Sequence, residues 1–570
     1  MEPAARTLCV FVLSGLCTLL VKTHDFHEGS NEKWLLDKID QLIGNWSRFP
    51  SYTVLLRTGF GEGLIRTLTT FLCEHFTDAS SFACTNLIDH YYSSVIYILE
   101  KIALNPGQTC SFLLDDCGEF FDFLNQKWDF EIPGNKPPVE EYPAIPSNSP
   151  RTRVLQVTDI HWDDNYLEGT EADCVGDFFQ CCRDLPLDGS TPKVPAGYWG
   201  TRASCHVPYR TVEAFFHHLK AREDDFDMIY WTGDLMDNAA WEQSRPFNVA
   251  HLRKLAYLFE RYFPDKPIYS TVGNHDMSPA FQYPLAISPD QFQPGWLYNE
   301  LPKIWKMEGA VEKASIEKSA SYSTKPFPGL RMISFNTNYN YPDDFWLLVN
   351  RTDPVGSLAW LRDQLLDAER LGEKAHLVAH DATGEFSSWA EHFYRLVNRF
   401  ESTLAVMVFG HRHTDEFLVY YEDFDSTKRP TNVAYLAPSF TTSRFRLPSF
   451  RIYTFDGPRE GASWRMLESE TYFLNLTTAN EHEDTYPDWE LFYKAKEGYG
   501  MENLSAREWD RLIGRFQRDP GLFELRLRHF YQTQEVPDCD SHCQLTHFCR
   551  MKSAITGFRE TLCPFLPDPA

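Results

Sequence analysis

The chain lacks an excess of basic residues. Its 570 residues include 54 Lys and Arg against 80 Asp and Glu, which gives a formal charge of −26 at pH 7. A nucleic-acid-binding protein needs a basic face, so this balance excludes that class. It also opposes long-range attraction to anionic membranes at neutral pH. The 19 histidines and partly protonated carboxylates would reduce the negative charge in acid, so the composition is compatible with an acidic compartment.

Long apolar runs are missing after the first residues. Residues 8–21 form one apolar run behind Arg6 that is too short to span a bilayer. We interpret residues 1–23 as a signal peptide rather than as a buried helix, because of their position at the start of the chain. No later run suits a transmembrane helix, which predicts a soluble exported protein. The N-glycosylation sequons agree with export and lie at Asn45, Asn350, Asn475 and Asn503.

The cysteines after the signal peptide fall into three clusters of four. An even number of cysteines in an exported chain predicts disulfides within each cluster. Zinc binding by cysteine is the alternative, but oxidation competes with it in a secretory compartment. The clusters are Cys73, Cys84, Cys110 and Cys117; Cys174, Cys181, Cys182 and Cys205; and Cys539, Cys543, Cys549 and Cys563.

Four regions follow the signal peptide. Apolar residues at helical spacing predict a small helical domain over residues 31–122. Residues 123–150 are rich in proline and predict a stiff linker. Residues 151–465 hold strand-like runs and predict a large domain built on β-strands. Residues 466–570 predict a helical C-terminal region with a structural role, in which we expect helices over 489–496 and 522–532.

Short apolar runs in the central region end in Asp, Asn or His. Each run is rich in β-branched or aromatic residues and therefore predicts a buried strand. The runs are 153–158, 227–232, 267–272, 375–379 and 404–409. In sheets of this kind, ligands bind outside the carboxyl ends of the strands. The following side chains are therefore expected to converge on one rim: Asp159, His161, Asp234, Asn274, His380, His411 and His413.

These seven side chains indicate a metal site. Carboxylate, amide and imidazole donors suit zinc, manganese or iron(II), whereas a thiolate-rich set would indicate a structural zinc site. Seven donors are too many for one tetrahedral ion and about right for two ions that share a bridging carboxylate. Two metals roughly 3.5–4 Å apart stabilise both the attacking and the leaving oxygen of a displacement at phosphorus.

The ordered motifs resemble the calcineurin-like metallophosphoesterases. From about residue 25 to the C-terminus the chain resembles, more closely, the acid sphingomyelinase family. The segments that carry this second resemblance are 166–170, 173–174, 181–182, 197–200, 230–234, 345–348 and 352–354. They are highly specific, and they cover nearly the whole chain after the signal peptide.

The resemblance implies an α/β fold, a four-layer metallophosphoesterase β-sandwich flanked by helices. It also implies a small all-α saposin-like domain at the N-terminus and a helical C-terminal region. Saposin-type domains engage membrane or lipoprotein lipid; a plain helical cap is the alternative. The implied disulfides are Cys174–Cys181, Cys182–Cys205, Cys539–Cys543 and Cys549–Cys563. Two further cysteines that the family carries early in the saposin-like domain are missing, so Cys110 and Cys117 are left to pair with each other.

The resemblance also assigns roles at two zinc ions. Asp159, His161, Asp234 and His413 would hold one ion; Asn274, His380, His411 and the shared Asp234 would hold the other. A hydroxide between the ions attacks phosphorus. His275 is the candidate general acid for the leaving alkoxide, oriented by Asp276. A buried structural histidine is the alternative for His275.

The chain departs from the family at two places near this site. The family has a histidine four residues after the bridging aspartate, where this chain has Asn238. Asn can hydrogen-bond a phosphate oxygen but carries neither charge nor proton. The family's Pro-Pro-Gly run after the metal-binding histidine is replaced by residues 381–384, and a cysteine there and its partner near Asn340 are both missing.

Three functions are consistent with these features. The first is a secreted or lysosomal zinc phosphodiesterase that cleaves sphingomyelin to ceramide and phosphocholine. The second is a zinc phosphodiesterase on soluble phosphoesters such as nucleotides, although the saposin-like domain argues against it. The third is a catalytically impaired, metal-loaded lipid-binding protein, which Asn238 motivates. The sequence does not report the oligomeric state, and a monomer is the default expectation.

Overall fold

A computed structural model describes residues 79–101, 127–139, 141–174, 181–183, 191–382, 387–533, 536–555 and 558–564, with isolated residues between 63 and 74. The signal peptide, Asn45, Cys110 and Cys117 lie outside the described residues. The chain clusters into two compact units. The first unit consists of residues 1–126, 239–243 and 345–351, and the second contains the rest.

In the first unit the principal described element is helix α5 (Ser81–Lys101). Its apolar spacing is the one predicted, with Tyr91 and Val95 buried. Its aromatic side chains contact the 3-10 turn Phe345–Leu348: the rings of Tyr91 and Phe345 lie 6.4 Å apart, and those of Tyr97 and Trp346 5.7 Å apart. Cys73 and Cys84, from one predicted cluster, form a disulfide.

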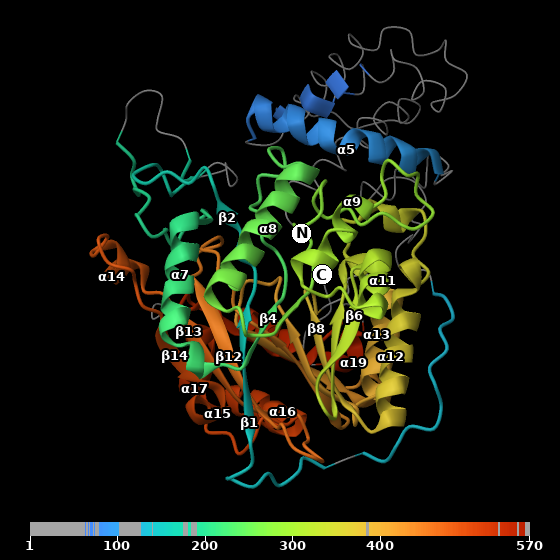
Figure 1. Ribbon diagram of the computed structural model, residues 1–570. Helices are drawn as coiled ribbons and strands as arrows, with labels where there is room; N and C mark the ends of the chain where they lie inside the picture. Colours follow the sequence, from blue (N-terminus) through green and yellow to red (C-terminus); the bar gives the residue numbers. More distant parts are fainter. Residues whose placement is uncertain are drawn as a thin grey trace. The chain divides into compact units, whose positions relative to one another are not determined.

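The second unit is built on two six-stranded sheets (Figure 1). The first sheet has the order β14 (Glu490–Lys494), β13 (Met466–Phe473), β12 (Ser449–Asp456), β1 (Arg151–Val157), β4 (Met228–Trp231) and β5 (Ile268–Ser270). The second has the order β10 (Glu416–Tyr421), β11 (Pro430–Leu436), β9 (Leu404–Phe409), β8 (Lys374–Ala379), β7 (Leu330–Phe335) and β6 (Tyr322–Phe327). A short pair is formed by β2 (Trp162–Asp163) and β3 (Val207–Pro208).

The five predicted runs form parallel strands of these sheets. Strands β1, β4 and β5 are mutually parallel, as are β7, β8 and β9. The sheets are joined by buried polar contacts, such as Gln156 Nε2 donating to the carbonyl of Phe409 over 2.9 Å. The hydroxyl of Ser334 likewise donates to the carbonyl of Ser270 over 2.7 Å. Parallel strands in both sheets therefore end on one rim.

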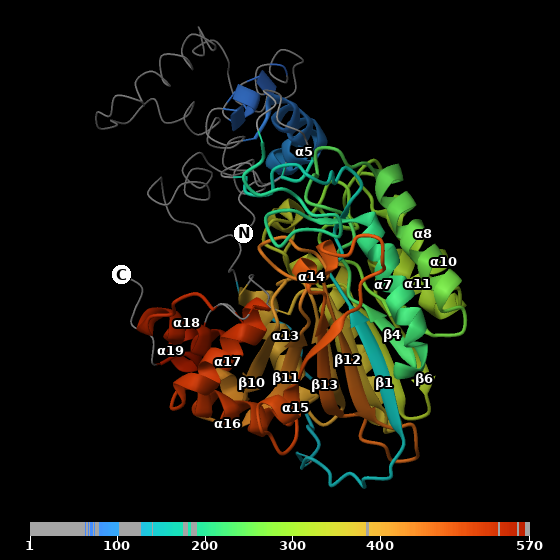
Figure 2. The same ribbon diagram turned by 90° about the vertical axis from the view of Figure 1, so that its left-hand side faces the viewer.

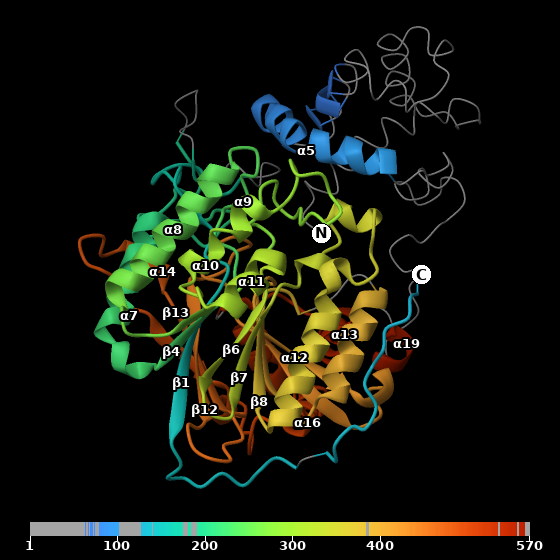
Figure 3. The same ribbon diagram turned by 45° about the vertical axis from the view of Figure 1, so that its right-hand side comes forward.

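Helices cover the outer faces of both sheets, so the predicted four-layer α/β sandwich is confirmed. On the first sheet lie α7 (Tyr209–Ala221) and α8 (Arg245–Tyr262), whose Phe216 and Phe259 rings are 5.0 Å apart. On the second lie α12 (Ser357–Leu371), which Figure 3 shows beside β7 and β8, and α13 (Ser387–Arg399), which contacts β10 and β11. Shorter helices are α9 (Gly295–Tyr298), α10 (Leu301–Ile304) and α11 (Ala310–Ser319).

Most helices of the C-terminal region follow residue 494. Figure 2 shows its helices beside β10 and β11. They are α15 (Ala495–Gly498), α16 (Ala506–Phe516), α17 (Pro520–Tyr531), α18 (Ser541–Lys552) and α19 (Arg559–Leu562); the short α14 (Leu476–Asn480) precedes them. The helix predicted over 522–532 is confirmed. The helix predicted over 489–496 is wrong, because Tyr493 pairs with Thr471 of β13 and its hydroxyl reaches Asp415. Residues 466–494 thus extend the first sheet.

The proline-rich segment contains neither helix nor strand in residues 127–139 and 141–150. It lies against the catalytic unit. The guanidinium of Arg399 donates to the carbonyls of Pro133 and Gly134, and the hydroxyl of Tyr142 donates to the carbonyl of Met466 over 2.9 Å. Of the helices that the structure describes, none has the length and apolar character needed to cross a bilayer.

Substitutions in and near the strand before His380 test how much the buried core contributes to the free energy of unfolding. Leu377 on β8 is 1% exposed, whereas Leu371 at the end of α12 is 51% exposed. We expect Leu377→Ala to lower the free energy of unfolding by about 2–5 kcal/mol, because it removes packed atoms and leaves a cavity. The same change at Leu371 should cost less than about 0.5 kcal/mol. Urea unfolding measures both; equal effects would contradict the described core.

Candidate metal centre

The structure brings all seven predicted donors together at the carboxyl ends of the parallel strands. They follow β1, β4, β5, β8 and β9, each within a few residues of the strand end. Six of them are buried, and His411 is partly exposed. Three groups of side chains have donor atoms within 4.8 Å of one another: Asp159, His161 and His413; Asp234, His380 and His411; and His161, Asp234 and His275.

The first two groups correspond to the two predicted ligand sets. In one, Nε2 of His413 lies 3.3 Å from Oδ1 of Asp159. In the other, Nε2 of His380 lies 3.1 Å from Oδ2 of Asp234 and 2.8 Å from Oδ1 of Asn274. Donors placed 2.0–2.1 Å from a tetrahedral cation stand roughly 3.3 Å apart. The observed separations are close to that value.

Asp234 belongs to both sets. Its Oδ2 atom lies 3.6 Å from Nε2 of His161, on one side, and 3.1 Å from Nε2 of His380, on the other. Its Oδ1 atom accepts a hydrogen bond from the backbone N–H of His275 over 2.8 Å. A carboxylate in this position has the geometry of a bridging ligand.

The histidine tautomers show that the site suits a cation. His380 Nδ1 lies 2.7 Å from the carbonyl of Thr232, and His161 Nδ1 lies 2.5 Å from the carbonyl of Met236. Each neutral imidazole must donate from Nδ1 to its carbonyl, so its Nε2 lone pair points at carboxylate oxygens. Nε2 of His161 is buried and has no hydrogen-bond partner among the described residues. Lone pairs that face oxygen in a buried site require a cation or a proton between them.

The carboxylates of the site favour positive charge on these imidazoles. Burial would lower the pKa of His380, but the charge of Asp234 and its hydrogen bond outweigh burial and raise the pKa to about 10. Burial would raise the pKa of Asp234, yet the charges of His380 and His275 hold it below its ordinary value. Both shifts report the same attraction between imidazole and carboxylate.

Several of the predicted donors share a strained backbone conformation. Five of the predicted donors have positive φ angles between 41° and 69°, and they are Asp159, His161, Asp234, His411 and His413. The left-handed region is unfavourable for residues with a side chain, by about 1–3 kcal/mol each, and such residues cluster at functional sites. Gly273 allows the close approach of two loops, since a Cβ at this position would come within 2.5 Å of the backbone nitrogen of Asp234.

Asp276 connects two loops of the site. Its carboxylate accepts hydrogen bonds from the backbone N–H groups of Gly273, Leu235 and Asp234, over 2.7, 2.9 and 3.2 Å. Asp276 thus ties together the loops that carry Asp234 and Asn274. That it also orients His275 stays a prediction.

His275 lies at the edge of the cluster. Its ring centre is 5.0 Å from that of His161 and 4.8 Å from that of Phe281. The side chain is 3% exposed. The structure thus places an imidazole next to Asp234 without making it part of either predicted ligand set, although it is near enough to Asp234 and His161 to share a cation.

His206 is a residue that the sequence analysis missed. Its Nε2 lies 3.3 Å from the backbone nitrogen of Asn238, its Nδ1 lies 2.9 Å from Oγ1 of Thr441, and its ring centre is 5.3 Å from that of His161. Asn238 is 5% exposed and so sits buried beside a second imidazole. His206 follows no strand-end motif, so only the tertiary structure could identify it. In the altered loop, Asp381 and Ala382 are described, and residues 383–386 lie outside the described part.

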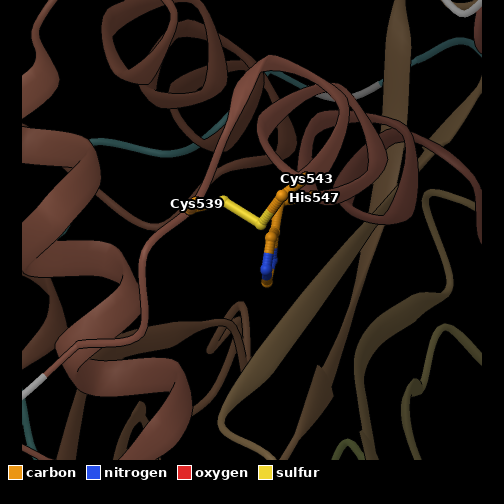
Figure 4. Close-up of side chains that lie close together, drawn as sticks. All are labelled: Cys539, Cys543 and His547. Carbon is orange, nitrogen blue, oxygen red and sulfur yellow. A yellow bond between two sulfur atoms is a disulfide. The ribbon is translucent and has the colours of Figure 1, made fainter.

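The four implied disulfides are confirmed. Cys182–Cys205 joins the segment that carries His206 to the loop after β2, and Cys174–Cys181 closes that loop. The other two, Cys539–Cys543 and Cys549–Cys563, cross-link residues of the C-terminal helical region. Figure 4 shows Cys539 and Cys543 bonded to each other beside His547. Zinc needs deprotonated thiolates, so these three side chains are not a zinc site while the disulfide is intact.

The sequence profile described as "Calcineurin-like phosphoesterase" matches residues 152–415. This match covers the parallel strands that lead to the site and every predicted donor, and it defines the class: a calcineurin-like phosphoesterase, for which divalent metal ions are the expected cofactors. A second profile, "Acid sphingomyelin phosphodiesterase C-terminal region", matches residues 429–556.

Several relatives match most of the chain. "Sphingomyelin phosphodiesterase 2" of Caenorhabditis elegans is 33% identical over 87% of this chain and 83% of its own length. "Sphingomyelin phosphodiesterase" of Homo sapiens is 35% identical over 85% of this chain and 76% of its own, and that of Bos taurus is 36% identical over 85% and 77%. The chain belongs to the sphingomyelin phosphodiesterase family and is a phosphodiester hydrolase, as the sequence predicted.

A substitution at Gly273 tests whether metal binding requires the close approach of the two loops. We expect Gly273→Ala to lower bound divalent metal at least about tenfold, because the new methyl group displaces Asp234 from its position between the histidines. Metal content after gel filtration measures this loss.

Gly134→Ala is the matched control. A Cβ at Gly134 meets nothing within 4 Å, so this variant should keep its metal. Full metal content in Gly273→Ala, with an unchanged circular dichroism spectrum, would contradict the described site.

Proposed function

We propose that the protein hydrolyses sphingomyelin to ceramide and phosphocholine at a centre of two zinc ions. The observation that carries this proposal is the place of Asp234, whose carboxylate lies between Nε2 of His161 at 3.6 Å and Nε2 of His380 at 3.1 Å. The family relationship favours sphingomyelin as the substrate.

Each ligand set offers four donors to one ion. Asp159, His161, Asp234 and His413 would hold the first, and Asp234, Asn274, His380 and His411 the second. Such a pair of ions supplies Lewis-acid charge for the phosphoryl oxygens and a water nucleophile active near neutral pH. Nitrogen and carboxylate donors without thiolate favour zinc in this role, with manganese and iron(II) as the other ions of matching chemistry.

His275 is proposed to protonate the leaving ceramide oxygen. Its backbone N–H is fixed on Oδ1 of Asp234 over 2.8 Å, so the residue is held beside the reacting centre. Asn238 is proposed to donate a hydrogen bond from its side-chain amide to a phosphate oxygen. The contact of its backbone N–H with His206 holds this segment in place.

The rest of the chain is proposed to bring the centre to lipid outside the cytosol. Residues 1–23 would direct export, and the confirmed disulfides are compatible with a secreted or lysosomal protein. Residues 31–122 are proposed to act as a saposin-like domain that presents lipid from a membrane or lipoprotein surface. The protein is proposed to act as a monomer.

Paired assays of purified protein test this function. We expect zinc-dependent release of phosphocholine from sphingomyelin micelles, lost after chelation and restored by zinc, because the ions supply the nucleophile. Asp234→Asn should be inactive. Turnover of a chromogenic phosphodiester alone would favour the soluble-substrate enzyme. Lipid binding with no turnover of either substrate would favour the catalytically impaired lipid-binding protein that Asn238 suggests.

The role of His275 can be separated from metal binding. We expect His275→Gln to lower kcat by about 10²–10⁴-fold on sphingomyelin, because a positioned general acid contributes that much. Its metal content should equal that of the unsubstituted protein. Phe281→Leu changes the neighbouring ring without removing a proton donor and is the control. Loss of metal in His275→Gln would identify His275 as a ligand instead.

A further inference from the structure

A cavity of about 240 Å³ lies at one edge of the first sheet. It is formed between helix α8, the edge strand β5 and the turn that follows helix α10. Figure 2 shows α8 and α10 side by side, and the two helices are in contact. The seven predicted metal donors are all described, and none of them lines this cavity. It is therefore a second concave site, separate from the metal centre.

The walls of the cavity are mainly apolar and aromatic. Trp231, Phe259, Phe263 and Trp305 line it, and each of these side chains is at most 4% exposed. The rings of Trp231 and Phe259 lie 6.2 Å apart. A dry cavity of roughly 150 Å³ is large enough to bind benzene, so this one has room for a short hydrocarbon chain or a single ring. Sites for drug-sized ligands measure roughly 300–1,000 Å³, so the ligand must be smaller than those.

Two polar atoms belong to the side chains of these walls and lack a partner. Nε1 of Trp231 and Nε1 of Trp305 are buried and have no hydrogen-bond acceptor among the described residues. The two side chains are 2% and 4% exposed. An indole N–H group can only donate, and a buried donor without an acceptor is destabilising. A ligand oxygen in the cavity would supply the acceptor that each indole lacks.

Two lysines also line the cavity. The ammonium of Lys306 lies 3.2 Å from a carboxylate oxygen of Glu260, and both side chains are exposed. Lys266 is half-buried, and its Nζ donates to the carbonyl of Phe226 over 2.6 Å. Within the described part of the chain, Lys266 forms no ion pair with a carboxylate. Because an ammonium has three N–H donors, two of those of Lys266 remain for a ligand.

The groups that await a partner are therefore donors, and one of them carries positive charge. A carboxylate on an apolar body meets both requirements, because its two oxygens accept several hydrogen bonds and it is attracted to an ammonium. The apolar body gains by leaving water for the aromatic walls. A phosphate or sulfate ion has no apolar part to fill these walls, and an alkylamine adds donors where acceptors are needed.

We propose that this cavity binds a small apolar carboxylate, of the size of a short-chain or medium-chain fatty acid. The carboxylate accepts hydrogen bonds from the two indole N–H groups and from Lys266, and the chain packs against Phe259 and Phe263. This binding site goes beyond the proposed hydrolysis of sphingomyelin and does not depend on it.

Isothermal titration calorimetry of the metal-loaded, full-length protein with sodium octanoate tests the proposal. We expect saturable binding of octanoate and no binding of octylamine, which has the same chain and no acceptor for the indoles. Trp305→Phe keeps a ring but removes the N–H donor, so it should weaken octanoate binding about tenfold or more. Ala256 lines the cavity from α8, and Ala256→Phe should abolish binding because the new ring fills the space.

Trp464→Phe is the matched control. Trp464 is 1% exposed and its Nε1 also lacks an acceptor among the described residues, but its side chain packs beside Leu330 and outside the cavity. This variant should bind octanoate like the unsubstituted protein, and metal content and Tm verify that each variant is folded.

Three results would overturn the proposal. They are no binding of octanoate, which would mean that the cavity holds water only; equal binding of octanoate and octylamine; and equal effects of the two tryptophan substitutions. Octanoate binding that is lost in Ala256→Phe, in a protein that releases no phosphocholine, would uphold the cavity as a ligand site and refute the proposed function.

Discussion

The mutual attraction between Asp234 and two imidazoles is the interaction on which the rest of the site depends. Its carboxylate lies on the boundary between the two donor groups, and both His161 and His380 turn their Nε2 atoms toward it. Carbonyls of Met236 and Thr232 fix those orientations from behind. A buried arrangement of this kind is unfavourable unless positive charge is present, so the fold holds its donors ready for cations.

The surrounding structure supplies the rigidity that such an arrangement needs. Five donors are held at positive φ, and only a backbone that is fixed from several directions maintains that conformation. Asp276 contributes by binding backbone amides of two separate loops. The disulfide Cys182–Cys205 likewise restrains the segment that carries His206.

The sequence, with the family resemblance that it carries, predicted the layered fold, four of the disulfides and the side chains that converge on the rim. Each donor follows a short apolar strand, and parallel strands necessarily end on the same rim, so a local pattern sufficed. Other features depend on contacts between distant segments. The sequence analysis predicted a helix over residues 489–496. Residues 490–494 form a strand instead, because they pair with β13. His206 and the contacts of Asp276 with Asp234 and Leu235 were found only in the tertiary structure, because these partners lie 32 or more residues away along the chain and no local pattern records them.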